Sequence, residues 1–415
     1  MLRPLRWLLA LGVLVSTTRA EAQRARNLAI TGVTVITGDG TVLRNHTILI
    51  ADSIIVAVAP AASVSPPAGA QVIDGRGKFV VPGFIDAHVH LATEPDGEDS
   101  RPRTELRLAA ALHGGVTTVR DMAGDTRALA PLARDARSGA IVSPDIYYVA
   151  LFAGPEFFRD PRTQSSSRGE TAGAVAWMRA VSDTTDFQTA VRQAKATGAT
   201  AIKLYALLDS TASARAVAEA HRQGMRVWAH AALRPATSGQ LAGAGVDAVS
   251  HASLLAQALP PAARTTFGTS AAPSAVFDSV LRVMAARHVV FDPTLFISQR
   301  TPAAIALAGA VTRRAREMGV PVAAGTDSIA AADERAVPNI HTEMELLVTQ
   351  AGFTPGDAIV AATRNGALAI GLTDRGIVAR GLRADLVLLR ADPTVDIRNT
   401  RQIEMVVKCG EILRR

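Results

Sequence analysis

The sequence predicts an α/β fold: a (β/α)8 TIM barrel over residues 83–371, with a small β-sandwich domain formed by both termini, 23–82 and 372–415. Through the middle of the chain an apolar strand followed by an amphipathic helix repeats, which is typical of a parallel barrel. Short β-rich runs broken by turn residues lie at both ends. The 415 residues, 48% of them hydrophobic and 20% charged, are enough for one large domain and a smaller one.

Eight apolar segments are expected to form the barrel strands, because each is short and most are rich in β-branched or aromatic residues. They are 84–90 (FIDAHVH), 116–122 (VTTVRDM), 146–153 (IYYVALFA), 200–206 (TAIKLYA), 226–231 (RVWAHA), 248–253 (AVSHAS), 289–296 (VVFDPTLF) and 321–328 (PVAAGTDS). Helical stretches such as 104–115 and 213–224 separate them and end in glycine, a common helix stop.

The β-rich runs at the two ends are expected to pair with each other into one sandwich. Residues 28–40 (LAITGVTVITGDG) and 70–81 (AQVIDGRGKFVV) precede the barrel, whereas 384–393 (ADLVLLRADP) and 403–413 (IEMVVKCGEIL) follow it. Glycine, proline and aspartate punctuate these runs as turns.

The first residues predict a secretory signal peptide, residues 1–22, and hence an exported protein that is periplasmic or secreted. Arg3 and Arg6 precede an apolar run over 7–15, and Ala20 and Ala22 supply the small residues before a cut after Ala22. A membrane anchor is the weaker interpretation, because the run is too short to span a bilayer, and we expect no stable membrane span elsewhere.

Charge and cysteine content exclude some classes of partner. The formal net charge is +7, or near +5 without the leader, but the basic residues are scattered and not interleaved with aromatic ones. We therefore expect no nucleic-acid partner. Cys409 is the single cysteine, so no intrachain disulfide can form. A small-molecule substrate is expected, and a homo-oligomer stays open.

Metal-ligand residue types stand at the expected strand ends, which all face one mouth of such a barrel. They are His88, His90, Lys203, His230, His251 and Asp327. Residues two apart in a strand share a face, so His88 and His90 point the same way, although a lone pair of this kind is as often structural. Four further histidines fall in turns or helices and are expected to be structural or exposed: His46, His113, His221 and His288.

Lys203 is the unusual member of this set, because an ammonium group cannot bind a metal. A buried lysine can lose its proton and add carbon dioxide, which gives a carbamate whose two oxygens can bridge two cations. The alternative is an ion pair between Lys203 and an acid at the barrel mouth. The four strand-end histidines and Asp327 around it favour the carbamate.

The pattern resembles the amidohydrolase superfamily of metal-dependent hydrolases. The matching residues are PGFIDAHVH (82–90), Lys203, His230, His251 and Asp327, in the family's chain order, and 399–413 resembles its closing strands. The lysine places the resemblance in the binuclear branch. Residues 115–122 (GVTTVRDM) and 201–206 (AIKLYA) resemble its dipeptidases and carboxypeptidases, the prolidase-like or imidazolonepropionase-like enzymes.

The resemblance implies two divalent metal ions, with zinc favoured over manganese or iron. His88, His90 and Asp327 would hold one, His230 and His251 the other, and carbamylated Lys203 with a hydroxide would bridge them. Asp327 would also be the catalytic proton shuttle. The implied reaction is cleavage of a C–N bond, the amide of a dipeptide or N-acyl amino acid.

Four further features have weaker predictions. Tyr205 could reach a substrate oxygen or be a rim residue, and His341 could line the mouth or cap a helix. Arg120 could face a substrate carboxylate, although an ion pair with Asp121 is favoured. The segment 154–177 lacks the Gly-Gly-His that related dipeptidases carry and is expected to be a lid or wall of the cleft, with a surface loop as the alternative.

Two other functions stay open. A mononuclear deaminase or cyclic amidase of the same fold is disfavoured by Lys203, because such deaminases usually lack a lysine on the fourth strand. A non-catalytic metal-binding relative is disfavoured by Asp327, because a binding site needs no proton shuttle.

Overall fold

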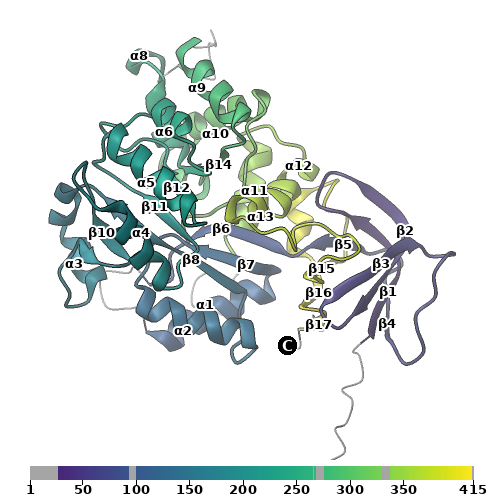
Figure 1. Cartoon of the computed structure of the whole chain (residues 1–415). Helices are drawn as coiled ribbons and strands as arrows, with labels where there is room; N and C mark the ends of the chain where they lie inside the picture. The colour runs from purple at the N-terminus through teal and green to yellow at the C-terminus, as the bar shows by residue number, and fades with distance from the viewer. Residues whose placement is uncertain (1–26, 93–99, 265, 268–274, 329–336, 414–415) are drawn as a thin grey trace, which may run out of the picture.

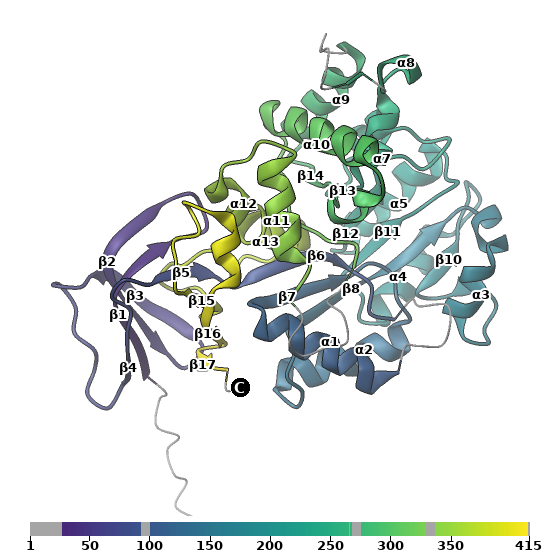
Figure 2. The same ribbon diagram turned by 180° about the vertical axis from the view of Figure 1, so that it is seen from behind.

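The computed structural model describes residues 27–92, 100–264, 266–267, 275–328 and 337–413, without the side chains of residues 162 and 165. The predicted leader, residues 1–22, lies outside these described residues. Figures 1 and 2 show helices surrounding a barrel and a smaller β domain packed against one side of it.

Within the described residues, parallel segments that pair in chain order form the barrel. The regular strands are β6 (Phe84–Val89), β7 (Val116–Asp121), β8 (Asp145–Ala153), β11 (Ala201–Leu204), β12 (Arg226–His230), β13 (Ala248–Ser250) and β14 (Val290–Asp292). The eighth segment, residues 320–327, closes the ring, because Val322 bridges Phe291 of β14 and the Ala87 amide of β6 donates to the Ala324 carbonyl (3.1 Å). The TIM barrel prediction is confirmed.

The helices on the outside of the barrel each bury one apolar face against the strands. They are α1 (Arg101–His113), α2 (Thr126–Ser138), α4 (Phe187–Ala196), α5 (Ser210–Arg222), α6 (Ser238–Ala244), α9 (Ala275–Ala286), α10 (Pro302–Glu317), α11 (Ile340–Thr349), α12 (Pro355–Ala361) and α13 (Arg364–Ile370). Helix α2 is representative: Asp125 accepts from the Arg127 amide (2.8 Å), Leu129 and Leu132 are buried, and Gly139 in the left-handed region (φ 73°) ends it.

In the small domain, strands from both ends of the chain form one mixed sheet. This sheet has a hydrophobic core separate from that of the barrel. Its strands are β1 (Asn27–Ile36), β2 (Val42–Ala51), β3 (Ile54–Pro60), β4 (Gln71–Asp74), β5 (Phe79–Pro82), β15 (Leu386–Leu389), β16 (Ile403–Lys408) and β17 (Glu411–Ile412). The order is β17-β16-β15-β5-β1-β2-β3, with β4 beside β1. Ile30, Ile48 and Leu388 share this core, so the predicted sandwich from both termini is confirmed.

A close approach joins this sheet to the first barrel strand. The Gly83 amide donates to the Asp385 carbonyl (2.8 Å), and a Cβ at position 83 would lie 2.2 Å from Thr117 Oγ1. Only glycine fits there, because no side chain tolerates such a distance.

A buried cluster of charges joins the two domains a second time. Asp145, the first residue of β8, lies 2.8 Å from Arg375 Nη1, 2.8 Å from Arg383 Nη1 and 3.0 Å from Lys408 Nζ. Burial raises the pKa of the Asp145 carboxyl, but the three cations outweigh it and lower the pKa to about 2. We call these four residues the Asp145 cluster.

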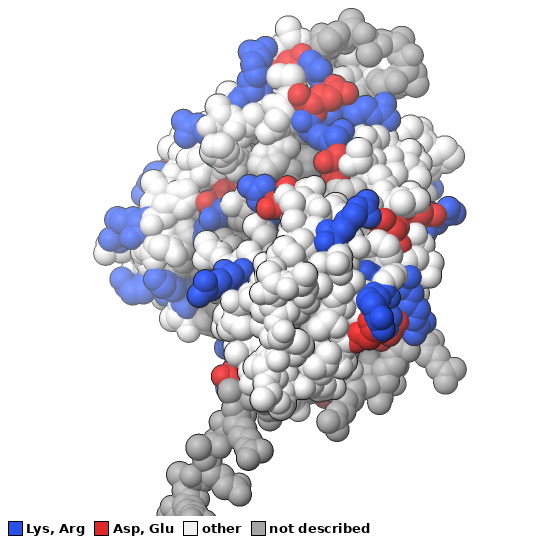
Figure 3. Space-filling view, turned by 90° about the vertical axis from the view of Figure 1, so that its right-hand side faces the viewer, with Lys and Arg blue, Asp and Glu red and all other residues white. Residues whose placement is uncertain are grey.

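The surface of the small domain mixes charges of both signs around a largely uncharged centre (Figure 3). On this face, lysine and arginine form separate patches, several of them beside aspartate or glutamate, and do not gather in one basic band. None of the helices in the described part of the chain has the length and apolarity needed to cross a membrane.

Candidate active site

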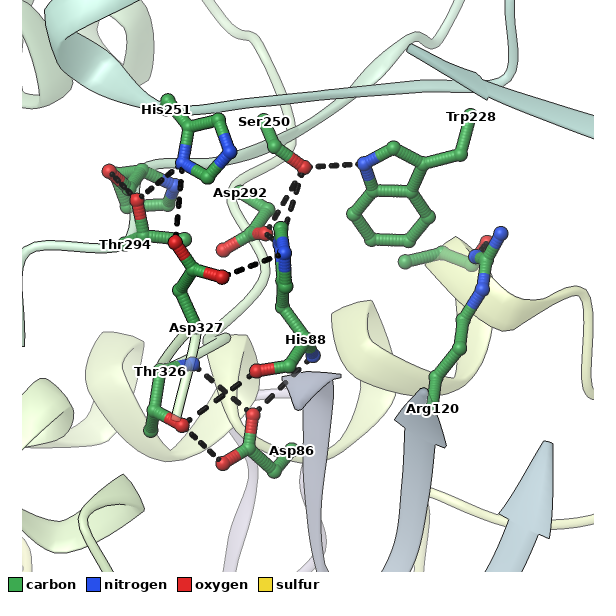
Figure 4. Close-up of polar contacts among 12 residues, drawn as sticks. Asp86, His88, Arg120, Trp228, Ser250, His251, Asp292, Thr294, Thr326 and Asp327 are labelled. Carbon is green, nitrogen blue, oxygen red and sulfur yellow. Dashed lines mark hydrogen bonds and ion pairs between the residues drawn. The ribbon is translucent and has the colours of Figure 1, made fainter. Parts of the chain in front are cut away.

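The C-terminal ends of the barrel strands bring four histidines and one aspartate together. His90 Nε2 lies 2.9 Å and His88 Nε2 3.1 Å from Asp327 Oδ1, and His251 Nε2 lies 3.2 Å from His230 Nε2. Figure 4 shows His88, His251 and Asp327 directed toward one another. We call these five residues the histidine–aspartate cluster.

The arrangement of donor atoms in this cluster fits a divalent metal ion. One ligand atom each from His88, His251 and Asp327 lies within 4.8 Å of the others. His88 Nε2 and His90 Nδ1 are buried and form no aligned hydrogen bond with the described residues. Imidazole nitrogens and a carboxylate that converge in this way are the ligand set that zinc and its neighbours accept.

Electrostatics set the protonation states of three members of the cluster, His230, His251 and Asp327. Burial lowers the pKa of His230 and His251 well below the usual value, and the neighbouring cations lower it further, so both rings are neutral. Burial raises the pKa of Asp327, but His88 and His90 outweigh it, and the pKa is far below the usual range. Neutral imidazole and ionised carboxylate are the forms that bind metal.

Lys203 is buried at the end of β11, beside the same cluster. Its amine forms no ion pair with a carboxylate of the described residues. Burial lowers the pKa of Lys203 to about 8, although the Asp327, Asp292 and Asp121 charges oppose this shift. A buried amine of this kind is readily deprotonated.

The backbone is strained where the cluster is held. His251, Asp327 and Thr294 adopt left-handed φ angles of 77°, 54° and 50°, which non-glycine residues rarely adopt. Such residues cost on the order of 1–3 kcal/mol each and cluster at functional sites. The Asp327 amide donates to the His88 carbonyl (2.8 Å), and this hydrogen bond maintains the conformation at the closure of the barrel.

Three supporting residues were missed in the sequence, although they follow the same rule of strand ends. Asp292, the last residue of β14, accepts from His88 Nδ1 (2.7 Å), and Ser250 at the end of β13 lies beside this pair. Thr294 Oγ1 lies 2.9 Å from His251 Nδ1 (Figure 4). Their positions in the sequence could have revealed them. Ser250 directly precedes His251, and Asp292 and Thr294 lie within the expected seventh strand, 289–296.

Asp86 supports the cluster from below and is not a ligand. It accepts from the Thr326 hydroxyl (2.7 Å), the Thr326 amide (3.0 Å) and the His88 amide (3.2 Å). These hydrogen bonds connect the first barrel strand to the eighth segment, directly beneath the members of the histidine–aspartate cluster that each contributes.

Tyr205 lies at the mouth, next to the cluster. Its ring is 4.1 Å from the His230 ring and 4.8 Å from the Phe157 ring, measured between centroids. Lys203 Nζ lies 5.2 Å from the same ring. This placement agrees with a substrate contact, which stays a prediction.

The segment 154–177 forms a wall beside Tyr205. It contains η1 (Pro155–Arg159), α3 (Pro161–Ser167) and β9 (Ala174–Val175), and the next strand, β10 (Met178–Ala180), pairs with the end of β8. Phe157 contacts Tyr205 and Phe158 is buried, so the segment packs against the site. The alternative prediction, that 154–177 is a surface loop, is wrong for η1, α3 and β9, which are regular elements.

The predictions for Arg120 are wrong. Its side chain is 1% exposed and turns into the barrel, where the guanidinium lies 4.1 Å from the centroid of the Trp228 ring and donates to the Ala369 carbonyl (3.2 Å). Asp121 instead accepts from the Leu91 and Gly124 amides (both 2.6 Å). Arg120 therefore neither pairs with Asp121 nor faces the mouth, because its long side chain reaches stacking contacts inside the barrel.

The prediction that His341 lines the mouth is also wrong. His341 is fully buried, contacts Thr400 Oγ1 (2.9 Å) through Nδ1, and donates to the Gly114 carbonyl (2.9 Å) through Nε2. Gly114 precedes β7, so this histidine lies at the opposite end of the strands. It joins α1 and α11 to the C-terminal segment, because α11 packs at that end.

Comparisons with known proteins agree with this geometry. The model of the amidohydrolase family matches residues 79–413. The imidazolonepropionase of Anaeromyxobacter sp. (strain K) is 30% identical over 77% of each chain, whereas a 44% identical match to that of Pyrobaculum arsenaticum covers 18% of each chain. A structure from Bifidobacterium longum described as a prolidase is 26% identical, covers 94% of this chain and 95% of its own, and has a TM-score of 0.70.

Proposed function

Because this chain belongs to the amidohydrolase family, we propose that it is a metal-dependent hydrolase that cleaves the C–N bond of a dipeptide or N-acyl amino acid. One observation carries the proposal: four histidines, one aspartate and one buried lysine converge at a single barrel mouth. The likeness to a structure described as a prolidase supports the substrate class.

The chain's own residues supply two neighbouring metal sites in this proposal. His88, His90 and Asp327 would hold one ion, and His230 with His251 the other, with zinc favoured. Lys203, as a carbamate formed with carbon dioxide, would contribute oxygens to both. When bound, such ions lower the pKa of water and polarise a substrate carbonyl.

Asp327 is the proposed proton shuttle. Its carboxylate lies 3.1 Å from His88 Nε2 and 2.9 Å from His90 Nε2, beside the proposed metal sites, where it would take a proton from the attacking water and deliver it to the leaving nitrogen. Tyr205 beside His230 would orient a substrate oxygen, and Phe157 of the wall would limit the access of water on that side.

Hydrolysis of a cyclic amide is the second candidate. The observation that favours it is the 30% identity to a protein named imidazolonepropionase. The buried Lys203 favours the first candidate over a mononuclear cyclic amidase, because a site with one metal ion needs no bridging ligand. Substrates with open and closed amides separate the two candidates directly.

The test combines metal analysis with an amidase screen on the purified protein. After reconstitution with Zn²⁺ and bicarbonate, we expect two metals per chain and release of free amine from some members of a panel of dipeptides and N-acyl amino acids. His230→Ala should lose metal and activity. His46→Ala is the matched control, because His46 is a partly exposed histidine on β2 of the small domain and contacts the Arg44 carbonyl.

Three outcomes would contradict the proposal in different ways. A stoichiometry of one would refute the binuclear site. Turnover of cyclic amides alone would favour the second candidate. Unchanged metal content in His230→Ala would show that the histidine–aspartate cluster does not bind the metal in the proposed way.

We also propose that the chain is exported, on the basis of the arginine-led apolar run over 7–15 and the small residues before position 23. Fractionation of cells that express the full chain tests this proposal. The protein should lack its first 22 residues and appear outside the cytoplasm.

A further inference from the structure

A continuous series of polar contacts leads from the barrel interior to His88. The Trp228 indole N–H donates to Ser250 Oγ, which lies 3.2 Å from Asp292 Oδ2 and 3.3 Å from His88 Nδ1. Asp292 Oδ2 is in turn 2.7 Å from His88 Nδ1. All four side chains are fully buried, and Figure 4 shows them side by side.

The direction of every hydrogen bond in this series follows from the groups themselves. An indole nitrogen only donates and a carboxylate only accepts, so Ser250 Oγ accepts a hydrogen bond from the Trp228 N–H, and His88 Nδ1–H donates one to Asp292. Because His88 Nδ1 then has no lone pair, the single Ser250 hydroxyl proton also goes to Asp292. His88 Nε2, which faces the cluster, is left as the nitrogen that can bind a metal.

We propose that Trp228, Ser250 and Asp292 are positioning residues that fix the tautomer and ring orientation of His88 for metal binding. The proposal rests on the function proposed above, since it concerns the same site. Partners that orient a metal-binding histidine typically change metal affinity about 10–100-fold when they are removed. Asp292 acts directly on His88, and Ser250 and Trp228 act through Asp292.

Packing holds this series in one arrangement. Arg120 lies over the Trp228 ring at 4.1 Å, so the indole is clamped from one face. Gly325 lets Asp292 approach, because a Cβ at position 325 would lie 2.6 Å from Asp292 Oδ1 and 2.8 Å from His88 Cβ. These contacts hold the indole beside Ser250 and the carboxylate beside His88.

The experiment measures Zn²⁺ affinity by competition with a chromophoric chelator, together with the visible spectrum of protein loaded with Co²⁺ alone. Ser250→Ala removes the central hydroxyl, and Trp228→Phe keeps an aromatic ring under Arg120 but removes the N–H. Ser213→Ala is the matched control, because Ser213 is equally buried and hydrogen-bonds only within α5 and its cap, to the Asp209 carbonyl.

We expect Ser250→Ala to bind Zn²⁺ about tenfold more weakly, with an altered Co²⁺ spectrum, and Trp228→Phe to change in the same direction by less. Ser213→Ala should match the wild type in both readouts, even if its thermal stability falls. Wild-type affinity and spectrum in both Ser250→Ala and Trp228→Phe would overturn the inference while leaving the proposed function intact. A wild-type chain that binds no Zn²⁺ would instead overturn the proposed function, and the inference with it.

Discussion

Replacing Asp145 by asparagine should destabilise the whole chain, because Asp145 is the anion that holds three cations at the domain junction. Arg375, Arg383 and Lys408 all lie within 3.0 Å of its carboxylate, and their side chains are at most 17% exposed. Asparagine keeps the shape of the side chain but removes the charge. The three cations would then remain close together with only Asp385 beside Arg383 (2.9 Å) and Asp374 beside Arg375 (2.9 Å) to compensate them, and Lys408 would lose its carboxylate partner.

The magnitude follows from the pKa of Asp145. A decrease from the usual 3.8 to about 2 corresponds to roughly 2.5 kcal/mol of stabilisation at neutral pH, since each pKa unit is worth about 1.4 kcal/mol. Removing one partner of a buried ion pair costs about 3–5 kcal/mol, which agrees in scale. With an unfolding entropy of about 2 cal/mol/K per residue, we expect the Tm to fall by about 3 °C.

Thermal and urea unfolding followed by circular dichroism provide the assay. The folded pKa of Asp145 is depressed, so its stabilisation is present above about pH 4 and is lost as the pH falls toward 2. The difference between wild type and Asp145→Asn should therefore shrink below about pH 4. Asp74→Asn is the control, because Asp74 has a similarly lowered pKa of about 2 but pairs with Arg76 at the exposed surface.

A Tm for Asp145→Asn equal to that of the wild type would refute this reasoning. An effect of the same size for Asp74→Asn would also refute it, since water screens the exposed Asp74–Arg76 pair and its loss is expected to cost little stability. A difference between wild type and Asp145→Asn that persists unchanged at low pH would show that asparagine disturbs packing and that charge is irrelevant.

Three other predictions concern single residues. Lys203→Ala should lose most bound metal, and acetate should restore part of it as a free substitute for the tethered carbamate; metal content equal to wild type would contradict the bridging role. Asp327→Asn should keep part of its metal but reduce kcat by about 10²–10⁴-fold, and turnover within a few-fold of wild type would place the proton shuttle elsewhere. Burial lowers the pKa of His341 to about 4, so its neutral form should stabilise the fold above pH 6.5 by roughly 3 kcal/mol, and this should be lost as the pH falls to 4. Urea unfolding of wild type and His341→Gln between pH 7 and 4 measures this loss, and a difference that does not vary with pH would contradict it.

Periodicity and strand ends were enough to predict the barrel and its histidine–aspartate cluster. All strands of such a barrel end at the same mouth. A polar residue that directly follows an apolar strand can therefore be placed at that mouth from the sequence alone. Asp292 obeys the same rule. Its role could not be predicted, because no local sequence pattern distinguishes Asp292 from the many other acidic residues. Only the contact with His88 in the structure reveals it.

Arg120 and His341 show where such reasoning stops. The side chain of Arg120 is long enough to turn from a strand end into the interior, and its stacking partner Trp228 lies more than a hundred positions away. His341 belongs to a helix whose position depends on packing against Phe84 (5.4 Å between ring centroids) and on contact with Thr400. Both placements depend on contacts between distant segments, which periodicity does not encode.

The composite small domain has a consequence for the order in which the chain can fold. Its first five strands are made early, but β5 meets its partner β15 only after the entire barrel has been synthesised. Lys408, the last member of the Asp145 cluster along the chain, ends β16, which follows the barrel as well. During synthesis the edge of β5 therefore stays unpaired until β15 is made. Loss of residues 404–415 would remove most of β16 and all of β17 from the sheet, and would also remove the contact of Lys408 with Asp145 of the barrel.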